Sequence, residues 1–280
     1  MNNITSVFFG TPLFAVHTLT ALEEANMLPD VIVTMPDKPA GRGLEVKQSE
    51  AKLWALERDI PVLDPQNLRE PSDALDLLTN SEWDLFLVSA YGNLLPTSVL
   101  NLPQKGTLNV HPSLLPKYRG ASPIEGQILN DEKTVGVTIM LMDEELDHGP
   151  IVSQASITPE EWPLKASMLE EMLGKIGGDL LAETIQPWIQ NEITAEPQQH
   201  SEASFTEKIK KSDGEISLED DAYTNFLKFC AYDGWPGVYF FKDGKRIKIT
   251  DAEYKDGIFT PLKVIPEGKK EISYKNFAQS

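Results

Sequence analysis

Cysteine is almost absent from this sequence: Cys230 is the only one among 280 residues. A single thiol can neither close a disulfide within the chain nor supply a cysteine-based zinc site. A reducing compartment, the cytoplasm, is therefore the expected location. Cys230 follows Phe229 in a predicted helix, where we expect it to be a small, buried and unreactive residue.

Long apolar runs are absent too. Stretches such as 85–88 are far too short to span a bilayer. The opening MNNITSVFFGTP has no basic segment followed by an apolar one, so we expect no signal peptide. The sequence therefore gives no reason to expect a membrane among the partners, and no obligate protein partner is evident, so a monomer is expected.

Positive charge is scarce in the longer N-terminal part. Residues 1–205 carry 12 Lys+Arg against 30 Asp+Glu, whereas residues 206–280 carry 13 of each, and the net charge is −18. This acidity argues against broad, non-specific binding to nucleic acid. The change in charge indicates two domains, which we place at 1–190 and 206–280 with a polar linker at 191–205.

Signatures of common cofactors are missing as well. The turn Gly10-Thr11-Pro12 after the first apolar segment has one glycine, not G-x-G-x-x-G, and no Walker A pattern occurs. The histidines lack metal-ligand spacing, which argues against a zinc enzyme, and we expect His200 to be solvated in the linker. The four histidines are His17, His111, His148 and His200.

Short apolar segments alternate with helical patterns along residues 1–190. The run 84–89 is almost continuously apolar, as is typical of parallel sheets covered on both faces. A helix at about 49–58 is expected to turn Leu53 and Leu56 inward, and the Pro- and Gly-rich stretch 36–43 to form an irregular, mobile loop. The pattern predicts an α/β fold with a doubly wound, mostly parallel sheet. Strands are predicted near 7–9, 31–34, 60–63, 84–89, 106–111, 135–142 and 151–157.

Residues 206–280 have a different pattern. A helix is predicted at 220–232, and short strands at 237–241, 246–249, 257–258 and 262–265. This part therefore reads as a small β-rich domain.

The stretch 107–123, TLNVHPSLLPKYRGASP, carries the most informative chemistry. Asn109 and His111 are two apart on a strand that Pro112 ends, so their side chains share a face. An amide donor beside an imidazole can stabilise an oxyanion and move a proton. An isolated Asn-x-His is more often a strand end with a buried, hydrogen-bonded histidine, and that alternative stays open at this point.

Asp147 is the residue that we pair with Asn109 and His111. It lies in an acidic turn, 143–149, directly after a predicted strand. Spacing alone favours one more solvated acid. In a doubly wound sheet, however, the carboxyl ends of the strands gather at one crevice, which would bring this turn to His111. The carboxylate and the imidazole could then shuttle a proton.

Two motifs together, NVHPSLLPKYRG at 109–120 and LDHG at 146–149, resemble the formyltransferases that use 10-formyltetrahydrofolate. Within that family the chain is most similar to the methionyl-tRNA formyltransferases, through FGTPLFA at 9–15, PDKPAGRG at 36–43 and PEGKK at 266–270. The resemblance covers nearly the whole chain. It implies a Rossmann-like formyltransferase domain, a small OB-like β-barrel, and formyl transfer from 10-formyltetrahydrofolate to the α-amine of initiator methionyl-tRNA.

The resemblance also implies roles for single residues. Asn109 and His111 would stabilise the tetrahedral oxyanion, Asp147 would position His111, and no metal would be needed. Expected folate contacts are Ser89, Ala90, Tyr91, Gly92, Ser113, Leu114, Leu115, Pro116 and Asp143, and expected tRNA contacts are Lys38, Gly41, Arg42 and Gly43.

The sequence departs from the family pattern in two places. Residues 44–47, LEVK, are less basic than is usual there, and 252–254 lead almost directly to 256–259, so the barrel is abridged. The alternatives are the same transfer to an amino sugar or a purine-precursor amine, hydrolysis of the formyl-folate, and a folate- or tRNA-binding protein without turnover.

Overall fold

The computed structural model describes residues 4–40 and 45–279, and the chain forms two compact units. The first comprises Met1–Arg119, Gly136–Ser156 and Glu171–Ser204; the second comprises Gly120–Val135, Ile157–Glu170 and Phe205–Ser280. Two segments of the predicted first domain are thus grouped with the C-terminal part. The domain boundaries predicted from charge and composition stay a prediction.

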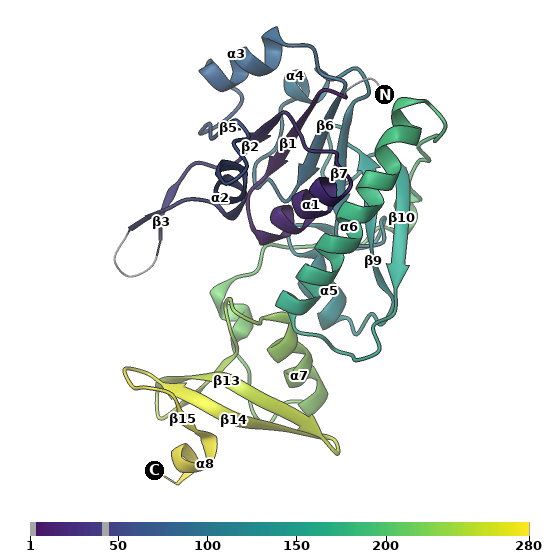
Figure 1. The fold of residues 1–280 in the computed structure, drawn as a ribbon. Helices are drawn as coiled ribbons and strands as arrows, with labels where there is room; N and C mark the ends of the chain where they lie inside the picture. The colour runs from purple at the N-terminus through teal and green to yellow at the C-terminus, as the bar shows by residue number, and fades with distance from the viewer. Residues whose placement is uncertain (1–3, 41–44, 280) are drawn as a thin grey trace. The chain divides into compact units, whose positions relative to one another are not determined.

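The first unit is built on a seven-stranded sheet with the order β10-β9-β7-β6-β1-β2-β5 (Figure 1). The pairs β1–β2, β1–β6, β2–β5 and β6–β7 are parallel, and β7–β9 is antiparallel. The predicted mostly parallel sheet is therefore confirmed. Its strands are β1 (Ser6–Gly10), β2 (Val31–Val33), β5 (Val62–Leu63), β6 (Leu85–Ser89), β7 (Thr107–His111), β9 (Val135–Leu141) and β10 (Ile151–Ile157).

Helices cover both faces of this sheet, as doubly wound topology requires. On one face, Phe9, Phe86 and Val88 pack with buried residues of α3 (Asp73–Asn80) and α4 (Thr97–Leu100). The other face is covered by α1 (Leu13–Glu24) and α6 (Ala166–Ile189), which run close together in Figure 1. Because β1 and β6 have helices on both sides, every position along them is buried.

Gly177 sets how closely α6 approaches the strand that carries the predicted site. A Cβ at Gly177 would lie 2.6 Å from Val110 Cγ1 and 3.0 Å from Val137 Cγ1. Real Cβ atoms do not tolerate such distances, so a larger residue would push the helix off the sheet. The glycine therefore keeps α6 tightly packed behind β7.

The predicted inner face of α2 (Glu50–Leu56) is wrong. Leu53 and Leu56 are 44% and 52% exposed, whereas Trp54 is only 7% exposed and packs inward with two alanines. The helix begins where expected, because the Ser49 side chain accepts a hydrogen bond from the Lys52 N–H at 3.1 Å. Burial of the large indole stabilises the helix more than burial of the leucines would, so the face that packs inward is centred one residue away from the predicted one.

The predicted irregular loop at 36–43 is also wrong in its first part. β3 (Lys38–Ala40) pairs antiparallel with β4 (Glu45–Lys47), and Pro39 lies opposite Val46. Proline is tolerated because a strand of a two-stranded ribbon has a free edge, where no N–H is needed. Residues 41–44 lie outside the described part of the chain.

The second unit contains an antiparallel four-stranded sheet in the order β12-β13-β14-β15, which confirms a small β-rich C-terminal part. β13 and β14 form one long hairpin, and Asp256 and Gly257 have φ of +51° and +80°. Two positive φ values in a two-residue connection are typical of a type I′ turn, so the abridged link is simply this turn. The elements are β12 (Tyr239–Lys242), β13 (Lys245–Lys255), β14 (Ile258–Pro266), β15 (Ile272–Ser273), α7 (Ala222–Ala231) and α8 (Tyr274–Ala278).

Within the second unit α5 (Pro123–Leu129) packs against α7. No helix within residues 4–40 and 45–279 is long and apolar enough to cross a membrane. The remaining short elements are β8 (Arg119–Gly120), β11 (Phe205–Thr206), and the 3₁₀ turns η1 (His200–Glu202) and η2 (Lys211–Gly214).

The revised face of α2 can be tested by truncation. Trp54→Ala should lower the free energy of unfolding by about 3–5 kcal/mol, because a buried indole is lost. Leu53→Ala, in the next position of the same helix, should cost less than about 1 kcal/mol because that side chain is largely solvated. Urea denaturation of both variants checks this, and a larger loss for Leu53→Ala would contradict the observed orientation.

Cys230 should be inert in the folded protein. It is 3% exposed, and burial raises the pKa of its thiol to about 12. Raising the pH to 9 should therefore leave it unreactive toward a chromogenic disulfide reagent, whereas in urea it should react with an ordinary pKa of about 8.5. Rapid labelling of the native protein at pH 8 would show that the thiol is accessible.

Candidate active site

Asn109 and His111 are the last polar residues of β7, in the middle of the sheet. Asn109 lies opposite Val88 on β6 and Met140 on β9, and His111 lies opposite Thr138. Alternation along the strand therefore places Asn109 and His111 on the same face, as predicted. They are only 9% and 4% exposed.

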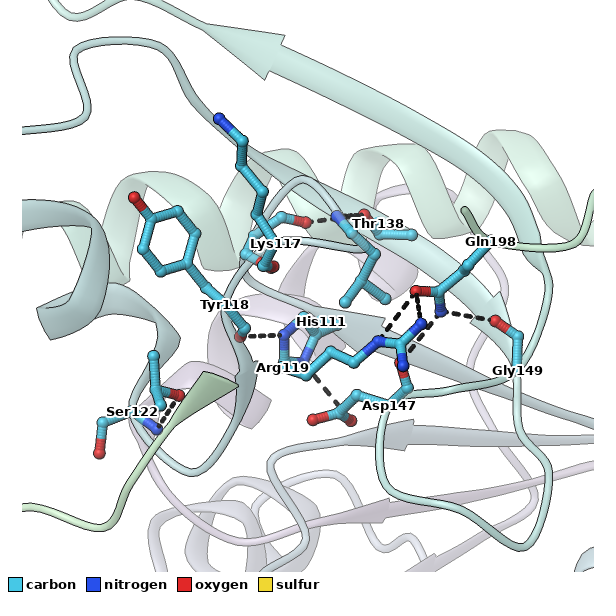
Figure 2. A network of polar contacts seen from close by, with 12 residues as sticks. His111, Lys117, Tyr118, Arg119, Ser122, Thr138, Asp147, Gly149 and Gln198 are labelled. Atoms are coloured by element: carbon cyan, nitrogen blue, oxygen red, sulfur yellow. Dashed lines mark hydrogen bonds and ion pairs between the residues drawn. The ribbon is translucent and has the colours of Figure 1, made fainter. Parts of the chain in front are cut away.

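The ring of His111 is held in one orientation by a backbone carbonyl. Its Nε2 lies 3.0 Å from the carbonyl oxygen of Tyr118 (Figure 2). A carbonyl can only accept, so Nε2 must carry the proton in this bond. In the neutral ring, Nδ1 is then the basic nitrogen, free of a proton.

Asp147 faces that nitrogen. Its Oδ1 lies 3.7 Å from His111 Nδ1, and its side chain is 12% exposed. This distance is too long for a hydrogen bond but close enough for a carboxylate to stabilise a proton that arrives on Nδ1. The predicted convergence of the 143–149 turn on the end of β7 is thus found, and the pair can accept a proton from an entering group.

The turn that carries Asp147 is tightly constrained. Asp147 has φ of +50°, in the left-handed region that glycine and, less often, Asn and Asp adopt. A side chain at Gly149 would collide with the carbonyl oxygen of Leu141, at the end of β9. Asp143 accepts a hydrogen bond from the Glu145 N–H at 3.0 Å and lies 2.7 Å from Nδ1 of His148.

The amide of Asn109 makes no hydrogen bond within the described part of the chain. It is therefore available to a ligand. An amide N–H₂ beside an imidazole can donate to an oxygen on which negative charge develops.

Two polar side chains that the sequence analysis missed hold the loop 113–116. Thr138 Oγ1 donates to the carbonyl oxygen of Ser113 at 2.7 Å and accepts from the Leu115 N–H at 3.0 Å. Gln154 Nε2 donates to Thr138 Oγ1 at 2.8 Å and to the carbonyl oxygen of Leu115 at 2.9 Å. Thr138 is a buried polar residue in the otherwise apolar strand β9, and that polarity could have identified it. Gln154 is exposed in β10, which also carries Ser153 and Ser156, and nothing in the sequence distinguishes it there.

The predicted folate residues at the end of β6 differ in their accessibility. Ser89 is buried, with Oγ 2.9 Å from Thr18 Oγ1, and burial raises the pKa of the Tyr91 hydroxyl to about 12. Ala90 and Gly92 have φ of +50° and +96°, which turns the chain sharply. Side chains of Ser89 and Tyr91 therefore point into the core, and this segment can offer a ligand mainly its backbone.

A pocket of about 540 Å³ opens beside this turn. Tyr91 and Gly92 contribute to its wall, together with residues 66–70, Asn93 and Leu94. The other predicted folate residues, and the three predicted catalytic ones, do not line it.

Of the predicted tRNA contacts, Lys38 is exposed on β3. Gly41, Arg42 and Gly43 lie outside the described residues.

Two histidines that are far apart in sequence are stacked. The ring centroids of His148 and His200 are 4.1 Å apart with an interplanar angle of 4°. His200 is exposed, as predicted, and its Nδ1 also lies 2.9 Å from Arg119 Nη2. No group of three His, Cys, Asp or Glu side chains that could hold a metal occurs among residues 4–40 and 45–279.

Comparison with known proteins shows the family of the chain. Residues 2–181 match the formyl transferase family, and residues 208–260 match the formyl transferase C-terminal domain. The chain belongs to the formyl transferase family. Methionyl-tRNA formyltransferase of Chloroflexus aurantiacus is 40% identical to this formyl transferase over 261 residues, 92% of this chain and 84% of the relative. That of Thermodesulfovibrio yellowstonii is 36% identical over 292 residues, 97% of this chain and 94% of the relative.

Solved structures share the formyl transferase fold. Methionyl-tRNA formyltransferase from Clostridium thermocellum gives a TM-score of 0.60 at 15% identity, covering 96% of this chain and 99% of that one. WlaRD, a sugar 3N-formyl transferase crystallised with dTDP and 5-N-formyl-THF, gives 0.66 at 20% identity, covering 98% of each chain. At these identities the likeness concerns the fold.

Thr138 should be essential to the loop that it bridges. Thr138→Val leaves the Ser113 carbonyl and the Leu115 N–H without their buried partner, so the free energy of unfolding should fall by about 2–4 kcal/mol. Thr79→Val, on the exposed surface of α3, makes the same chemical change and should cost less than about 1 kcal/mol. Equal losses in chemical denaturation would contradict the role of the bridge.

Proposed function

We propose that this formyl transferase moves a formyl group from 10-formyltetrahydrofolate to the α-amine of initiator methionyl-tRNA. The observation that carries the chemistry is the His111–Asp147 pair, because the Tyr118 carbonyl holds the ring with Nδ1 toward the carboxylate at 3.7 Å. The choice of acceptor is supported by relatives 36–40% identical over most of the chain, which are methionyl-tRNA formyltransferases.

The proposed reaction begins with attack of the neutral α-amine on the formyl carbon. Asn109 donates to the oxygen that becomes negative, and Nδ1 of His111 takes the proton that the attacking nitrogen loses. Asp147 stabilises the resulting imidazolium. The bond from the formyl carbon to the folate nitrogen then breaks, that nitrogen receives the proton, and the products are formylmethionyl-tRNA and tetrahydrofolate.

The folate would bind along two backbone segments that end at neighbouring strands. In the first segment, 89–92, Ala90 and Gly92 are exposed, and Asp143 would add a carboxylate. The second segment, 113–116, is stiffened by Thr138 and Gln154, which suits a donor that must be held in one orientation.

Acceptor binding would use Lys38 together with Gly41, Arg42 and Gly43, which follow it in the sequence. The net charge of −18 argues that tRNA is held by a few local contacts rather than by a broad basic surface. A cytoplasmic monomer with a catalytic domain at 1–190, a linker at 191–205 and a small domain at 206–280 fits the two family matches, at 2–181 and 208–260.

Formyl transfer to charged initiator tRNA tests the proposal. His111→Ala should lower kcat by about 10²- to 10⁴-fold because it removes the proton acceptor. His17→Ala, an imidazole on α1 at the contact with Gly174, should retain wild-type turnover.

The wild-type assay also separates the other acceptors. The folate could be turned over with an amino sugar, a purine-precursor amine or water, but not with methionyl-tRNA. That result would contradict methionyl-tRNA as the acceptor and would still support transfer of the formyl group from the folate. Binding of tRNA without folate turnover and without dependence on His111 would overturn the enzyme proposal.

A further inference from the structure

Gln198 lies in the segment that composition predicts to be a linker, yet it is 5% exposed. The chain on its N-terminal side is anchored, because Glu196 and Ile151 exchange two backbone hydrogen bonds of 2.8 Å. Figure 2 shows the Gln198 side chain between the guanidinium of Arg119 and the turn that contains Asp147 and Gly149.

The partners of Gln198 define which end of its amide is oxygen. Oε1 accepts from Arg119 Nε at 3.1 Å and from Nη2 at 2.6 Å. Nε2 donates to the carbonyl oxygens of Asp147 at 3.0 Å and Gly149 at 2.7 Å. Guanidinium nitrogens only donate and carbonyl oxygens only accept, so a flipped amide would lose all four bonds.

The two carbonyls belong to the turn that presents Asp147 to His111. The left-handed backbone of Asp147 is one that aspartate tolerates, so the position of the turn depends on the contacts made to it. Gly149 lies so close to β9 that a Cβ there would collide with the Leu141 carbonyl oxygen, which leaves the turn little room on that side. Gln198 Nε2 donates to the carbonyl oxygens on both sides of His148. Two bonds from one amide restrict both the translation and the rotation of the turn.

We propose that Gln198 is a positioning residue of the formyl transfer site. Its amide Nε2 holds the Asp147–Gly149 turn so that the Asp147 carboxylate stays opposite Nδ1 of His111. The inference rests on the proposed function, since it acts through the residues that carry that chemistry. Loss of the two donated bonds leaves the carboxylate present but misplaced, and a misplacement of about 1 Å can cost up to about 10²-fold in rate.

Two substitutions separate the two ends of the amide. Gln198→Met keeps the size and removes all four bonds. Gln198→Glu keeps oxygen acceptors for Arg119 and replaces the donors to Asp147 and Gly149 by a second oxygen, which repels the two carbonyls. Gln199→Met is the matched control, because Gln199 is exposed and its side chain makes no hydrogen bond in the described chain.

The experiment measures kcat and KM for formyl transfer, thermal melting, and the same substitutions in an Asp147→Asn background under single-turnover conditions. Both Gln198 variants should lower kcat about 10- to 100-fold with KM nearly unchanged, and Gln199→Met should match wild type. In the Asp147→Asn background, Gln198→Met should add less than about 3-fold, because the carboxylate on which it acts is already gone.

Three results would overturn the inference. A full additional loss in the Asp147→Asn background would mean that Gln198 acts independently of the carboxylate. If Gln198→Glu kept the wild-type kcat while Gln198→Met lowered it, the loss of rate would come from the bonds between Gln198 Oε1 and Arg119. A change confined to melting temperature would make the residue structural only. Failure of the wild-type enzyme itself to formylate any amine is the separate result that overturns the proposed function.

Discussion

The site depends on one hydrogen bond, from Nε2 of His111 to the carbonyl oxygen of Tyr118. That bond requires the loop after β7 to fold back on the strand, and Tyr118 does so with φ of +60° while its N–H donates to Ser204 Oγ at 2.9 Å. The strand itself is immobilised between β6 and β9 with α6 packed behind it. The ring orientation is thus a product of the whole sheet.

Polar side chains that bind backbone groups hold the loops around this site. Thr138 and Gln154 secure the loop 113–116, and Gln198 secures the turn at Asp147. A buried amide or hydroxyl is costly unless its hydrogen bonds are made, so Thr138 and Gln198, which are 0% and 5% exposed, tolerate little displacement of the backbone that they contact. This gives precision to loops that have no regular secondary structure.

The sequence predicted the features that depend on repetitive burial. Continuous apolar runs identified the central strands, and alternation along β7 placed Asn109 and His111 on one face. The gathering of strand ends in a doubly wound sheet pointed to Asp147 near His111, although spacing alone favoured a solvated acid. These predictions succeeded because a sheet covered on both faces allows few other strand positions and side-chain orientations.

Other features depend on contacts that no periodicity reveals. On α2 a helical period fits either Leu53 or the neighbouring Trp54, and only the size of the indole decides. The ribbon of β3 and β4 is too short to show alternation. Gln198 stands in a polar stretch where nothing distinguishes a buried glutamine from a solvated one, so its position became evident only in the fold.

The turn at Asp256-Gly257 has a consequence for how this family can vary. A Cβ on Gly257 would meet no atom within 4 Å, so the tip of the β13–β14 hairpin is unobstructed. Side chains alternate along both arms, and therefore residues can be added or removed two at a time on each arm without transferring any remaining side chain to the other face. Adding or removing an odd number of residues on one arm would turn the following side chains to the opposite face unless a β-bulge compensated. The register of this hairpin already shifts between Ile249 and Ala252. The hairpin can thus lengthen or shorten while the core beneath it keeps its packing.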